Sequence, residues 1–288
     1  MKVGGAGEFG LLEHIKPYLS DRAGRDDAAV VGTEAGLLVV SCDMFVENVH
    51  FDLGWMSPED AGWRSLALAL GDLAAKGATP LWATVSLAMP ATWDVADMVG
   101  LYRGMSDLAR QVSMEIVGGD MSGIEGPAVL SISLTGRTDR RPLERSQAQA
   151  GWSVGVTGPL GAAAVAFRER RPLRLQPRLD AGRRLNGLGL CCGDISDGLV
   201  REMEKFAFMA GVGCVLQAAD VPLAERASLD DALTGGEESD LVCVGPDGLV
   251  AASGLVVVGR LTSSRAVEVV DAAGNPMRLR GTGYDHFA

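Results

Sequence analysis

Residues 57–89 read SPEDAGWRSLALALGDLAAKGATPLWATVSLAM, and this stretch predicts a helix that leads directly into a strand. Ser57 is a typical N-cap residue, and Pro58 is favoured in the first turn of a helix. Apolar residues then follow helical spacing until Gly77, a residue type that commonly ends helices. The partly alternating run at 80–89 is typical of a strand. We therefore expect an α/β fold.

Strand and helix signals alternate along the rest of the chain in the same way. In the first half we expect strands at 37–43, 115–117 and 129–135 and a second helix at 94–112. In the second half we expect helices after Gly161, at 177–188 and at 197–210, and strands at 152–157, 212–216, 241–244, 256–259 and 267–270. A polar linker at 138–150 and a length of 288 residues favour two domains. We predict an N-terminal domain at 1–138 and a C-terminal α/β domain at 149–288.

The composition argues against several classes of protein. The formal net charge is −11, from 37 acidic and 26 basic residues, and a field of that sign repels nucleic acids and anionic membranes. No apolar run approaches the roughly 20 residues that span a bilayer, and we expect no secretory signal. Five cysteines without a CxxC spacing make a disulfide framework or a zinc site unexpected. We therefore expect a cytoplasmic protein that binds neither nucleic acid nor membrane.

Aspartates recur at the ends of expected strands and on the first helix. The positions are Asp26, Asp27, Asp43, Asp72, Asp120, Asp194 and Asp197. A carboxylate at the end of an apolar strand is costly to bury without a partner, and carboxylate oxygens are hard ligands that suit Mg²⁺. Taken singly, each aspartate is explained as a turn residue or a helix cap. Taken together they indicate a magnesium site, although their spacing alone does not bring them to one place.

The common nucleotide-binding motifs do not occur in the sequence. There is no GxxxxGK[ST], which excludes a P-loop enzyme, and the glycine loop, catalytic aspartate and DFG of protein kinases are missing. The segment 155–161, GVTGPLG, lies between an expected strand and an expected helix. Its backbone N–H groups either bind a phosphate or form a plain strand-to-helix turn, and both interpretations stay open.

An ordered series of short motifs runs through nearly the whole chain. It consists of GEF at 7–9, DDAA at 26–29, SCD at 41–43, VENVHF at 46–51, DLAAKGATP at 72–80, GGD at 118–120, DISDGL at 194–199, GGEE at 235–238 and GYDHF at 283–287. Each motif is short, but the ordered set is specific, and GYDHF is its most distinctive member. The series resembles the thiamine-monophosphate kinase family.

This resemblance implies a fold similar to the aminoimidazole-ribotide synthetase superfamily. Members have an N-terminal α/β domain that dimerises through its sheet and a C-terminal α/β domain, with ATP bound between them. The implied reaction transfers the γ-phosphoryl group of ATP directly to the phosphate of thiamine monophosphate and yields thiamine diphosphate. We therefore expect a homodimer that uses several Mg²⁺ ions, ATP as co-substrate and thiamine monophosphate as substrate.

The resemblance also implies a set of site residues. The magnesium ligands would be Asp27, Ser41, Asp43, Asp72, Asp120, Asp194 and Asp197, of which Asp43, Asp120 and Asp197 would be catalytic. The residues that contact ATP would be Tyr102, Gly119, Asp120, Arg145 and Ser196. Those that contact thiamine monophosphate would be His50, Glu237 and Tyr284.

Some of these residues also have structural explanations. Arg145 either contacts a phosphate or is a solvated arginine of the polar linker. His50 either contacts substrate or is a structural histidine. Tyr284 and Phe287 either pack in the core or form a flap that stacks on the aminopyrimidine ring.

Charge supports the metal-dependent interpretation. Both substrates are anionic, and two like charges about 4 Å apart repel by about 4 kcal/mol at an effective dielectric constant of about 20. A site rich in carboxylates is therefore compatible with ATP only if divalent cations bind there as well. The acceptor is a phosphate oxygen that is already ionised at neutral pH, so no strong general base is expected.

The sequence departs from the family pattern at a few positions. Cys42 replaces the usual threonine, and Glu238 and Ser239 replace an aspartate and a tyrosine. Alternative functions are another member of the superfamily, a catalytically weakened nucleotide- or metal-binding homologue, and a metal-dependent phosphatase. Selenophosphate synthetases carry a reactive cysteine or selenocysteine in an N-terminal loop, and 1–10 contain no cysteine. The hydrogenase-maturation protein ends in cysteine, whereas this chain ends in alanine.

Overall fold

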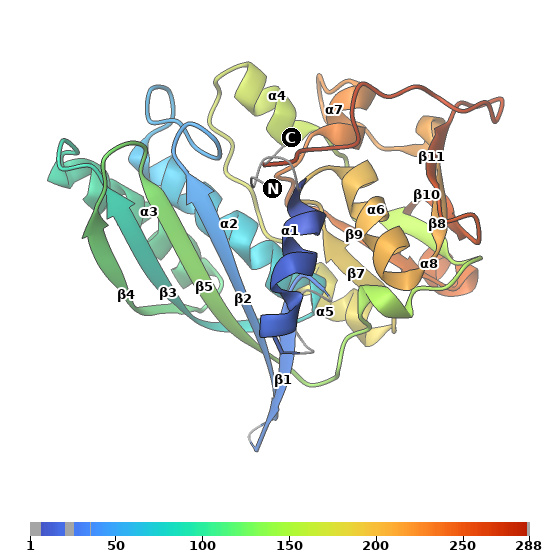
Figure 1. Ribbon diagram of the computed structural model, residues 1–288, viewed down its shortest axis with the longest axis horizontal. Helices are drawn as coiled ribbons and strands as arrows, with labels where there is room; N and C mark the ends of the chain where they lie inside the picture. Colours follow the sequence, from blue (N-terminus) through green and yellow to red (C-terminus); the bar gives the residue numbers. More distant parts are fainter. Residues whose placement is uncertain (1–6, 21–25, 35, 287–288) are drawn as a thin grey trace.

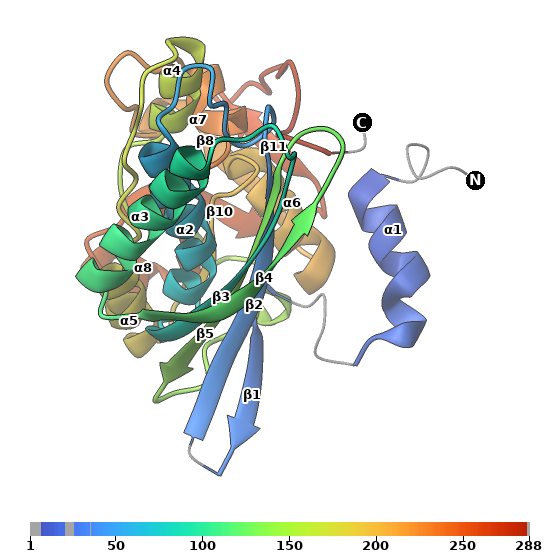
Figure 2. The same cartoon turned by 90° about the vertical axis from the view of Figure 1, so that its left-hand side faces the viewer.

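The computed structural model describes residues 7–20, 26–34 and 36–286, which form two sheets and their surrounding helices (Figure 1). The first sheet holds β1 (Ala29–Thr33), β2 (Gly36–Val46), β3 (Thr79–Met89), β4 (Glu115–Gly123) and β5 (Val129–Thr138), in the order β1-β2-β5-β3-β4. Neighbouring strands are antiparallel except for the parallel pair β3 and β4. Figure 2 shows α2 (Pro58–Ala75) and α3 (Val95–Gln111) on one side of this sheet and α1 (Gly7–Ile15) on the other.

The second sheet belongs to the C-terminal half and has the strand order β11-β8-β10-β6-β9-β7. Its strands are β6 (Ser153–Val156), β7 (Cys191–Asp194), β8 (Gly213–Gln217), β9 (Leu241–Gly245), β10 (Val256–Thr262) and β11 (Val267–Val270). The helices of this half are α4 (Ala162–Arg168), α5 (Leu179–Gly187), α6 (Leu199–Ala210), α7 (Leu229–Thr234) and α8 (Asp247–Ala252). Short 3₁₀ turns lie at Lys16–Tyr18, Arg145–Gln147 and Ala218–Asp220. Among the described residues, no helix has the length and apolar character that a membrane span requires.

Helix α2 begins and ends as its sequence predicts. The side chain of Ser57 accepts a hydrogen bond from the backbone N–H of Asp60 (3.1 Å), which satisfies one of the unpaired donors of the first turn. At the other end, Gly77 leaves the helix with a left-handed backbone (φ 59°), a conformation that glycine adopts without a steric penalty. The strand β3 then starts at Thr79, as the local sequence indicates.

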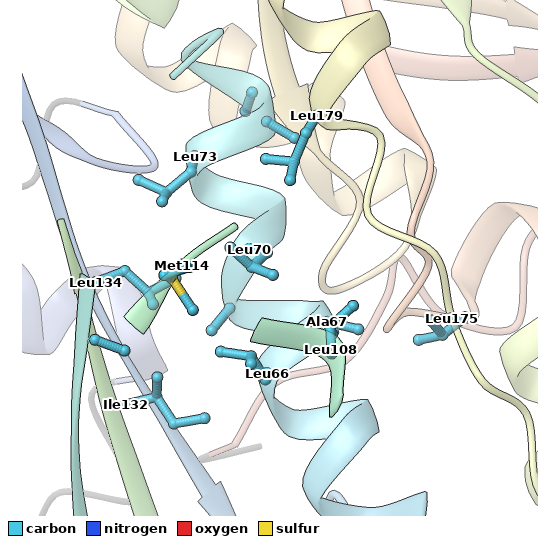
Figure 3. Close-up of a cluster of buried hydrophobic side chains, with 14 of the residues drawn as sticks. Leu66, Ala67, Leu70, Leu73, Leu108, Met114, Ile132, Leu134, Leu175 and Leu179 are labelled. Carbon is cyan, nitrogen blue, oxygen red and sulfur yellow. The ribbon is translucent and has the colours of Figure 1, made fainter. Parts of the chain in front are cut away.

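One hydrophobic core spans both halves of the chain, with α2 at its centre. Figure 3 shows Leu66, Leu70 and Leu73 of this helix among residues of the first sheet, and all three are fully buried. Across the helix, the indole N–H of Trp63 donates to the carbonyl of Leu175 (2.8 Å), in the segment between α4 and α5. The C-terminal half contributes to the same core Leu175, Leu179, Leu185, Leu190, Cys192, Leu241, Cys243, Val250 and Leu255.

The expected α/β class is confirmed, and most expected elements form with displaced ends. β4 is longer than expected, so that Gly118, Gly119 and Asp120 lie within the strand. The N-cap residue of α6 is Gly198, so Asp197 is not a helix cap. The helices α1, α7 and α8 and the strands β1 and β7 were not anticipated, because segments this short carry weak periodicity. The domain boundary between 138 and 149 stays a prediction.

Cys192 and Cys243 form a disulfide, which corrects the expectation drawn from cysteine spacing. The two residues lie opposite each other on the antiparallel strands β7 and β9, with Cα atoms 4.0 Å apart. Their separation along the chain is 51 residues, so only the register of the strands brings them together. Cys42, Cys191 and Cys214 are free thiols.

Gly182 lies where α5 approaches α2, and its lack of a side chain allows this contact. A Cβ added at this position would overlap the carbonyl oxygen of Ala74 in helical backbone. We expect Gly182→Ala to lower the free energy of unfolding by about 1–3 kcal/mol, because overpacking forces the backbone to shift. Gly187→Ala in the same helix is the matched control, since no atom lies within 4 Å of its added Cβ. Urea unfolding followed by circular dichroism measures both, and equal stabilities of the two variants would contradict the contact.

Candidate active site

A cleft of about 760 Å³ is lined by residues of both halves. Its walls come from the segment before β1, from β2, α2, the end of β7 and α6, and from the C-terminal tail at 280–286. Most of the predicted site residues line it, namely Asp27, Asp43, His50, Asp72, Arg145, Asp194, Ser196, Asp197, Glu237 and Tyr284. Side chains that are far apart in sequence therefore share one space.

Three aspartates form the centre of the cleft, and we call Asp27, Asp72 and Asp194 the carboxylate centre. Asp27 precedes β1, Asp72 lies on α2, and Asp194 is the last residue of β7. One carboxylate oxygen from each lies within 4.8 Å of the other two. This separation allows a single cation to contact all three side chains.

Burial and mutual repulsion disfavour the ionised forms of these carboxyls. Burial raises the pKa of Asp72 well above its ordinary value, and the charges of Asp43 and Asp194 raise it further. Burial also raises the pKa of Asp194 well above its ordinary value. For Asp43, burial and the charge of Asp27 raise the pKa to about 6. Such carboxyls need nearby positive charge if they are to be ionised together at neutral pH.

Two glycines make room for this arrangement. Gly71 directly precedes Asp72 on α2, and a Cβ added to it would lie 3.2 Å from the carboxylate of Asp194. A Cβ added to Gly193 would lie 2.6 Å from Nη2 of Arg145. The missing side chains thus let α2 approach β7 and let the guanidinium lie against the strand.

Two cations, the buried Arg145 and the partly buried Lys205, bind the acidic side chains around the centre. Arg145 binds Asp27 through Nη1, and its Nη2 donates to Glu202 (2.7 Å). Lys205 donates to Asp197 and to Glu202, each at 2.7 Å. Only 3% of the Arg145 side chain is exposed, so the interpretation of Arg145 as a solvated linker arginine is wrong. Its guanidinium is bound to carboxylates at the edge of the cleft.

Lys76, at the end of α2, is a third cation, and its side chain has no exposed surface. It donates to Asp26 Oδ1 (2.5 Å) and to the carbonyl of Cys192 (3.0 Å), and its Nζ lies 3.4 Å from Asp27 Oδ2. Burial opposes its charge, but the carboxylates of Asp26 and Asp27 outweigh this and raise the pKa of Lys76 above its ordinary value. Burial would raise the pKa of Asp27, but Arg145 and Lys76 hold it below its ordinary value.

The remaining atoms of the site suit hard divalent cations. Within the described part of the chain, Asp27 Oδ2 and the hydroxyl of Ser41 are buried without a hydrogen-bond partner. Ser41 precedes Asp43 by two residues on the same face of β2. The donors around the carboxylate centre are all oxygens, which is the ligand type that Mg²⁺ prefers. Acidic side chains outnumber basic ones: Asp26, Asp27, Asp43, Asp72, Asp194, Asp197 and Glu202 surround Lys76, Arg145 and Lys205. The site residues therefore fit magnesium.

His50 belongs to a second group of side chains in the same cleft. Its Nδ1 accepts a hydrogen bond from the backbone N–H of Val46 (3.0 Å), so the neutral ring carries its proton on Nε2. Burial lowers the pKa of His50, which favours this neutral form. The ring lies between those of Phe45 and His286, with centroid distances of 5.7 and 5.2 Å. These contacts fix the orientation of the imidazole.

Glu237 and Arg64 connect the two halves beside His50. The guanidinium of Arg64, on α2, donates to Glu237 Oε2 and to the carbonyl of His50 (3.2 Å). It also lies 4.6 Å from the ring centre of Phe167. The other carboxylate oxygen of Glu237, Oε1, is buried and has no hydrogen-bond partner among the described residues. This oxygen is available as an acceptor for a ligand.

The C-terminal tail forms one wall of the cleft. The backbone N–H of Tyr284 donates to the carbonyl of Asp197 (3.0 Å), and Asp285 forms an ion pair with Arg201 (3.1 Å). The ring of Tyr284 lies edge-on to His286 at 4.7 Å and is 48% exposed. The interpretation of Tyr284 as a core residue is therefore wrong. Phe287 lies outside the described residues.

Tyr102, Gly119 and Asp120 lie elsewhere in the chain. They line a separate pocket of about 620 Å³ at the edge strand β4. Asp120 pairs with Ser86 of β3, and β3 and β5 separate β4 from β2, which carries Asp43. Three strand spacings correspond to about 14 Å. The expectation that all the predicted aspartates converge within one chain is therefore wrong for Asp120.

The sequence did not single out the side chains that hold the acids in place. Lys205 follows Glu202 by three residues on α6, a spacing that places both side chains on one side of the helix. Arg64 and Lys76 are charged residues on a helix that is apolar on nearly every side, and such residues usually have a buried partner. The spacing along α6, and the presence of charged residues in an otherwise apolar helix, were the sequence features that could have pointed to these side chains. Glu202 also accepts from the hydroxyl of Ser196 (3.2 Å).

Comparisons with known proteins agree with this architecture. The family described as AIR synthase related protein, N-terminal domain, matches residues 25–138. Thiamine-monophosphate kinase of Synechococcus elongatus is 31% identical over 98% of this chain and 96% of its own, and that of Halobacterium salinarum is 33% identical over 95% and 96%. The structure of AaThiL complexed with AMPPCP and TMP matches with a TM-score of 0.88 at 28% identity, over 99% of each chain.

The first domain and its carboxylate-rich cleft thus define an α/β protein of the AIR-synthase-related class. Sequence identity of 31% and 33% to two thiamine-monophosphate kinases, over 98% and 95% of this chain, identifies the family within this class. The chain belongs to the thiamine-monophosphate kinase family.

Glu238 supports the wall of the cleft that α4 provides. Its Oε1 accepts hydrogen bonds from the backbone N–H groups of Gly161 (2.8 Å) and Ala163 (3.4 Å), and the residue is 4% exposed. Burial raises the pKa of Glu238 to about 7, although these N–H groups favour the charged form. The backbone N–H of Gly161 is thus already bound to a carboxylate. For the segment 155–161 this favours a plain strand-to-helix turn over a phosphate-binding loop.

We expect Glu238 to make the stability of the protein fall between about pH 4.5 and about pH 7. Its pKa is raised on folding, so in this range the folded protein holds a proton that the unfolded chain releases. The contribution is fully present below about pH 4.5 and is lost as the pH rises through about 7. The difference in unfolding free energy between wild type and Glu238→Gln should change by on the order of 3 kcal/mol across this range. Urea unfolding at several pH values measures it, and a constant difference would contradict the assignment.

Proposed function

We propose that this protein transfers the γ-phosphoryl group of ATP to the phosphate of thiamine monophosphate, which yields thiamine diphosphate and ADP. Membership of the family supports this reaction. The observation that carries the proposal is the cleft itself, in which the carboxylate centre shares one space with His50, Glu237 and Tyr284. Phosphoryl transfer needs a centre that compensates phosphate charge, next to a pocket for the organic part of the acceptor.

Magnesium is the proposed cofactor. The residues that would hold it in this chain are Asp27, Ser41, Asp43, Asp72, Asp194 and Asp197. Asp27 Oδ2 and the hydroxyl of Ser41, which have no hydrogen-bond partner among the described residues, and the closeness of the carboxylate centre support this assignment. When bound, Mg²⁺ neutralises phosphate charge and orients the phosphate oxygens.

The second group of side chains would bind the thiamine half of the acceptor. Glu237 Oε1 is an unpaired acceptor, and the exocyclic amine of an aminopyrimidine is a suitable donor for it. The exposed ring of Tyr284 would stack on the same heterocycle. The Nε2–H of His50 is oriented by its neighbours and would donate to the phosphate or to the linker oxygen. Recognition would thus use both polar and aromatic contacts.

The chemistry requires little from the side chains beyond orientation and charge. The acceptor oxygen belongs to a phosphate that is ionised at neutral pH, so no group has to remove a proton. Arg145 and Lys205 place positive charge at the edge of the cleft, where both pair with Glu202. Asp43 and Asp197 are proposed as catalytic residues in the sense that they fix the position of the phosphates through bound magnesium.

We propose that a second copy of the chain completes the site. On the first sheet, the face away from α2 exposes Val40, Met44 and Trp82, apolar side chains that suit sheet-on-sheet packing. Asp120 pairs with Ser86 on this face and is too far from Asp43 to share a metal within one chain. A homodimer formed through the sheet would bring Tyr102, Gly119 and Asp120 of the partner subunit to the nucleotide. Cys42 lies on this face too, so it is expected at the interface.

The proposed reaction suits a cytoplasmic location, where ATP and magnesium are available. A catalytically weakened homologue is the alternative, and the departures at Cys42, Glu238 and Ser239 are its only support. Glu238 stands where the family usually has an aspartate, and its side chain binds the backbone at the start of α4. The presence of glutamate at this position is therefore compatible with an intact cleft.

Purified protein incubated with ATP, excess Mg²⁺ and thiamine monophosphate should form thiamine diphosphate and ADP in equal amounts, as measured by chromatography. Chelation of the metal should stop the reaction. We expect Asp43→Asn to lower kcat by about a hundredfold or more, because it removes a proposed metal ligand. Asp139→Asn, an exposed position after β5, is the control and should leave kcat unchanged. Absence of product in excess Mg²⁺ would reject the proposed function.

Mixing two inactive variants tests whether the site is shared between subunits. Asp43→Asn and Asp120→Asn should each be nearly inactive as homodimers. In a heterodimer, one composite site carries both substitutions and the other carries neither. After subunits exchange at random, activity should recover to about a quarter of that of the wild type. No recovery, in spite of heterodimers detected by mass spectrometry, would show that each site is built within one chain.

A further inference from the structure

Lys76 stands out as a charged side chain that the proposed reaction does not use. Its ammonium lies among three oxygens from separate parts of the chain: Asp26 Oδ1 at 2.5 Å, the carbonyl of Cys192 at 3.0 Å and Asp27 Oδ2 at 3.4 Å. The side chain has no exposed surface, and those of Asp26 and Asp27 are each 4% exposed. The environment is therefore a small oxygen-lined position that holds one positive charge.

This position continues directly into the carboxylate centre. Among residues 7–20, 26–34 and 36–286, the Asp27 oxygen that lies near Lys76 has no hydrogen-bond partner, and the second oxygen of Asp26, Oδ2, is also buried without one. Without the ammonium, the two adjacent buried carboxylates would share, among the described side chains, the single guanidinium of Arg145, which also binds Glu202. An unpaired buried charge costs several kcal/mol, so some cation has to be present here.

We infer that the ammonium of Lys76 is a built-in cation, which takes a place among these oxygens that a divalent ion would otherwise occupy. It holds Asp27 in position for the carboxylate centre and limits the number of divalent ions that the cleft binds. Lys76 is therefore a positioning residue, not a ligand of the substrates. The inference rests on the proposed magnesium site, but it concerns how many ions that site takes and not which reaction follows.

Lys76→Met tests the inference, because methionine is of similar length and carries no charge. Binding of Mn²⁺ is measured by the loss of the free-ion signal in electron paramagnetic resonance. The variant should bind one more Mn²⁺ per chain than the wild type. Its melting temperature should fall without divalent ions and recover when they are added, by more than the wild type gains. An unchanged number of bound ions, together with a melting temperature that added ions do not restore, would overturn the inference.

Two control variants accompany this measurement. Lys76→Met/Asp26→Asn should lose the additional ion, since one of the carboxylates that would hold it is gone. Lys16→Met removes an exposed lysine, with 69% of its side chain accessible, and should bind Mn²⁺ like the wild type. If the double variant keeps the additional ion, Asp26 is not part of the position and the inference is wrong.

A measurement on the wild type covers the case in which Lys76→Met does not fold. A buried, ion-paired ammonium exchanges its protons slowly, so the side-chain ¹⁵N signal of Lys76 should be visible by NMR, and Lys76→Arg identifies it. Saturation with Mg²⁺ should leave this signal protected. Its disappearance would mean that the metal displaces the ammonium, which overturns the inference. A wild type that binds no divalent ion at all would instead count against the proposed function.

Discussion

The balance between buried carboxyls and buried cations is the constraint on which the rest of this structure depends. The carboxylate centre draws one side chain each from a loop, a helix and a strand end, so it exists only when those three elements are assembled. Arg145 and Lys205 extend this network to α6 through Glu202, which is fully buried. Ion pairs of this kind add little net stability, but leaving one partner unpaired is very costly. The two halves are thereby held in an arrangement in which Lys76, Arg145 and Lys205 each bind at least one of these carboxylates.

Helix α2 combines two roles that are usually kept apart. Most of its length is apolar and supports the core, whereas Asp72 lines the cleft, and Arg64 and Lys76 bind acidic residues that line it. A charged side chain on a helix buried on all sides is tolerated only where a partner meets it, and here the partners come from the other half of the chain or from before β1. The part of the cleft that α2 provides is therefore held by the same packing as the core.

Local features of the sequence predicted local structure well. The N-cap, the apolar spacing and the terminal glycine of α2 lie within one segment, so its ends followed from the sequence alone. Motif order identified most of the cleft residues, because it carries information on long-range assembly that periodicity lacks. The pairing of Cys192 with Cys243 was not predictable, since it depends on strand register. The distance from Asp120 to the cleft depends on strand order, which no local pattern reveals.

The basic residues that bind the acids, such as Lys76 and Arg64, were not predicted from the sequence for a related reason. Lys76 and Arg64 occur in a stretch whose apolar spacing predicts a buried helix and gives no sign of ion pairs. Their acidic partners, Asp26 and Glu237, lie far away in sequence. Only the complete fold shows that these side chains turn toward acids and not toward solvent.

The core shared around α2 has a consequence for how the chain can be divided. Leu175, Leu185 and Leu241 pack in the same apolar cluster as Leu70, although they lie in the C-terminal half. Cutting the chain at the polar linker would expose these leucines on one fragment and the back of α2 on the other. Each fragment would then expose apolar surface that the intact chain buries. The two halves that the strand order distinguishes thus share the apolar packing around α2, while the C-terminal half has a second core of its own.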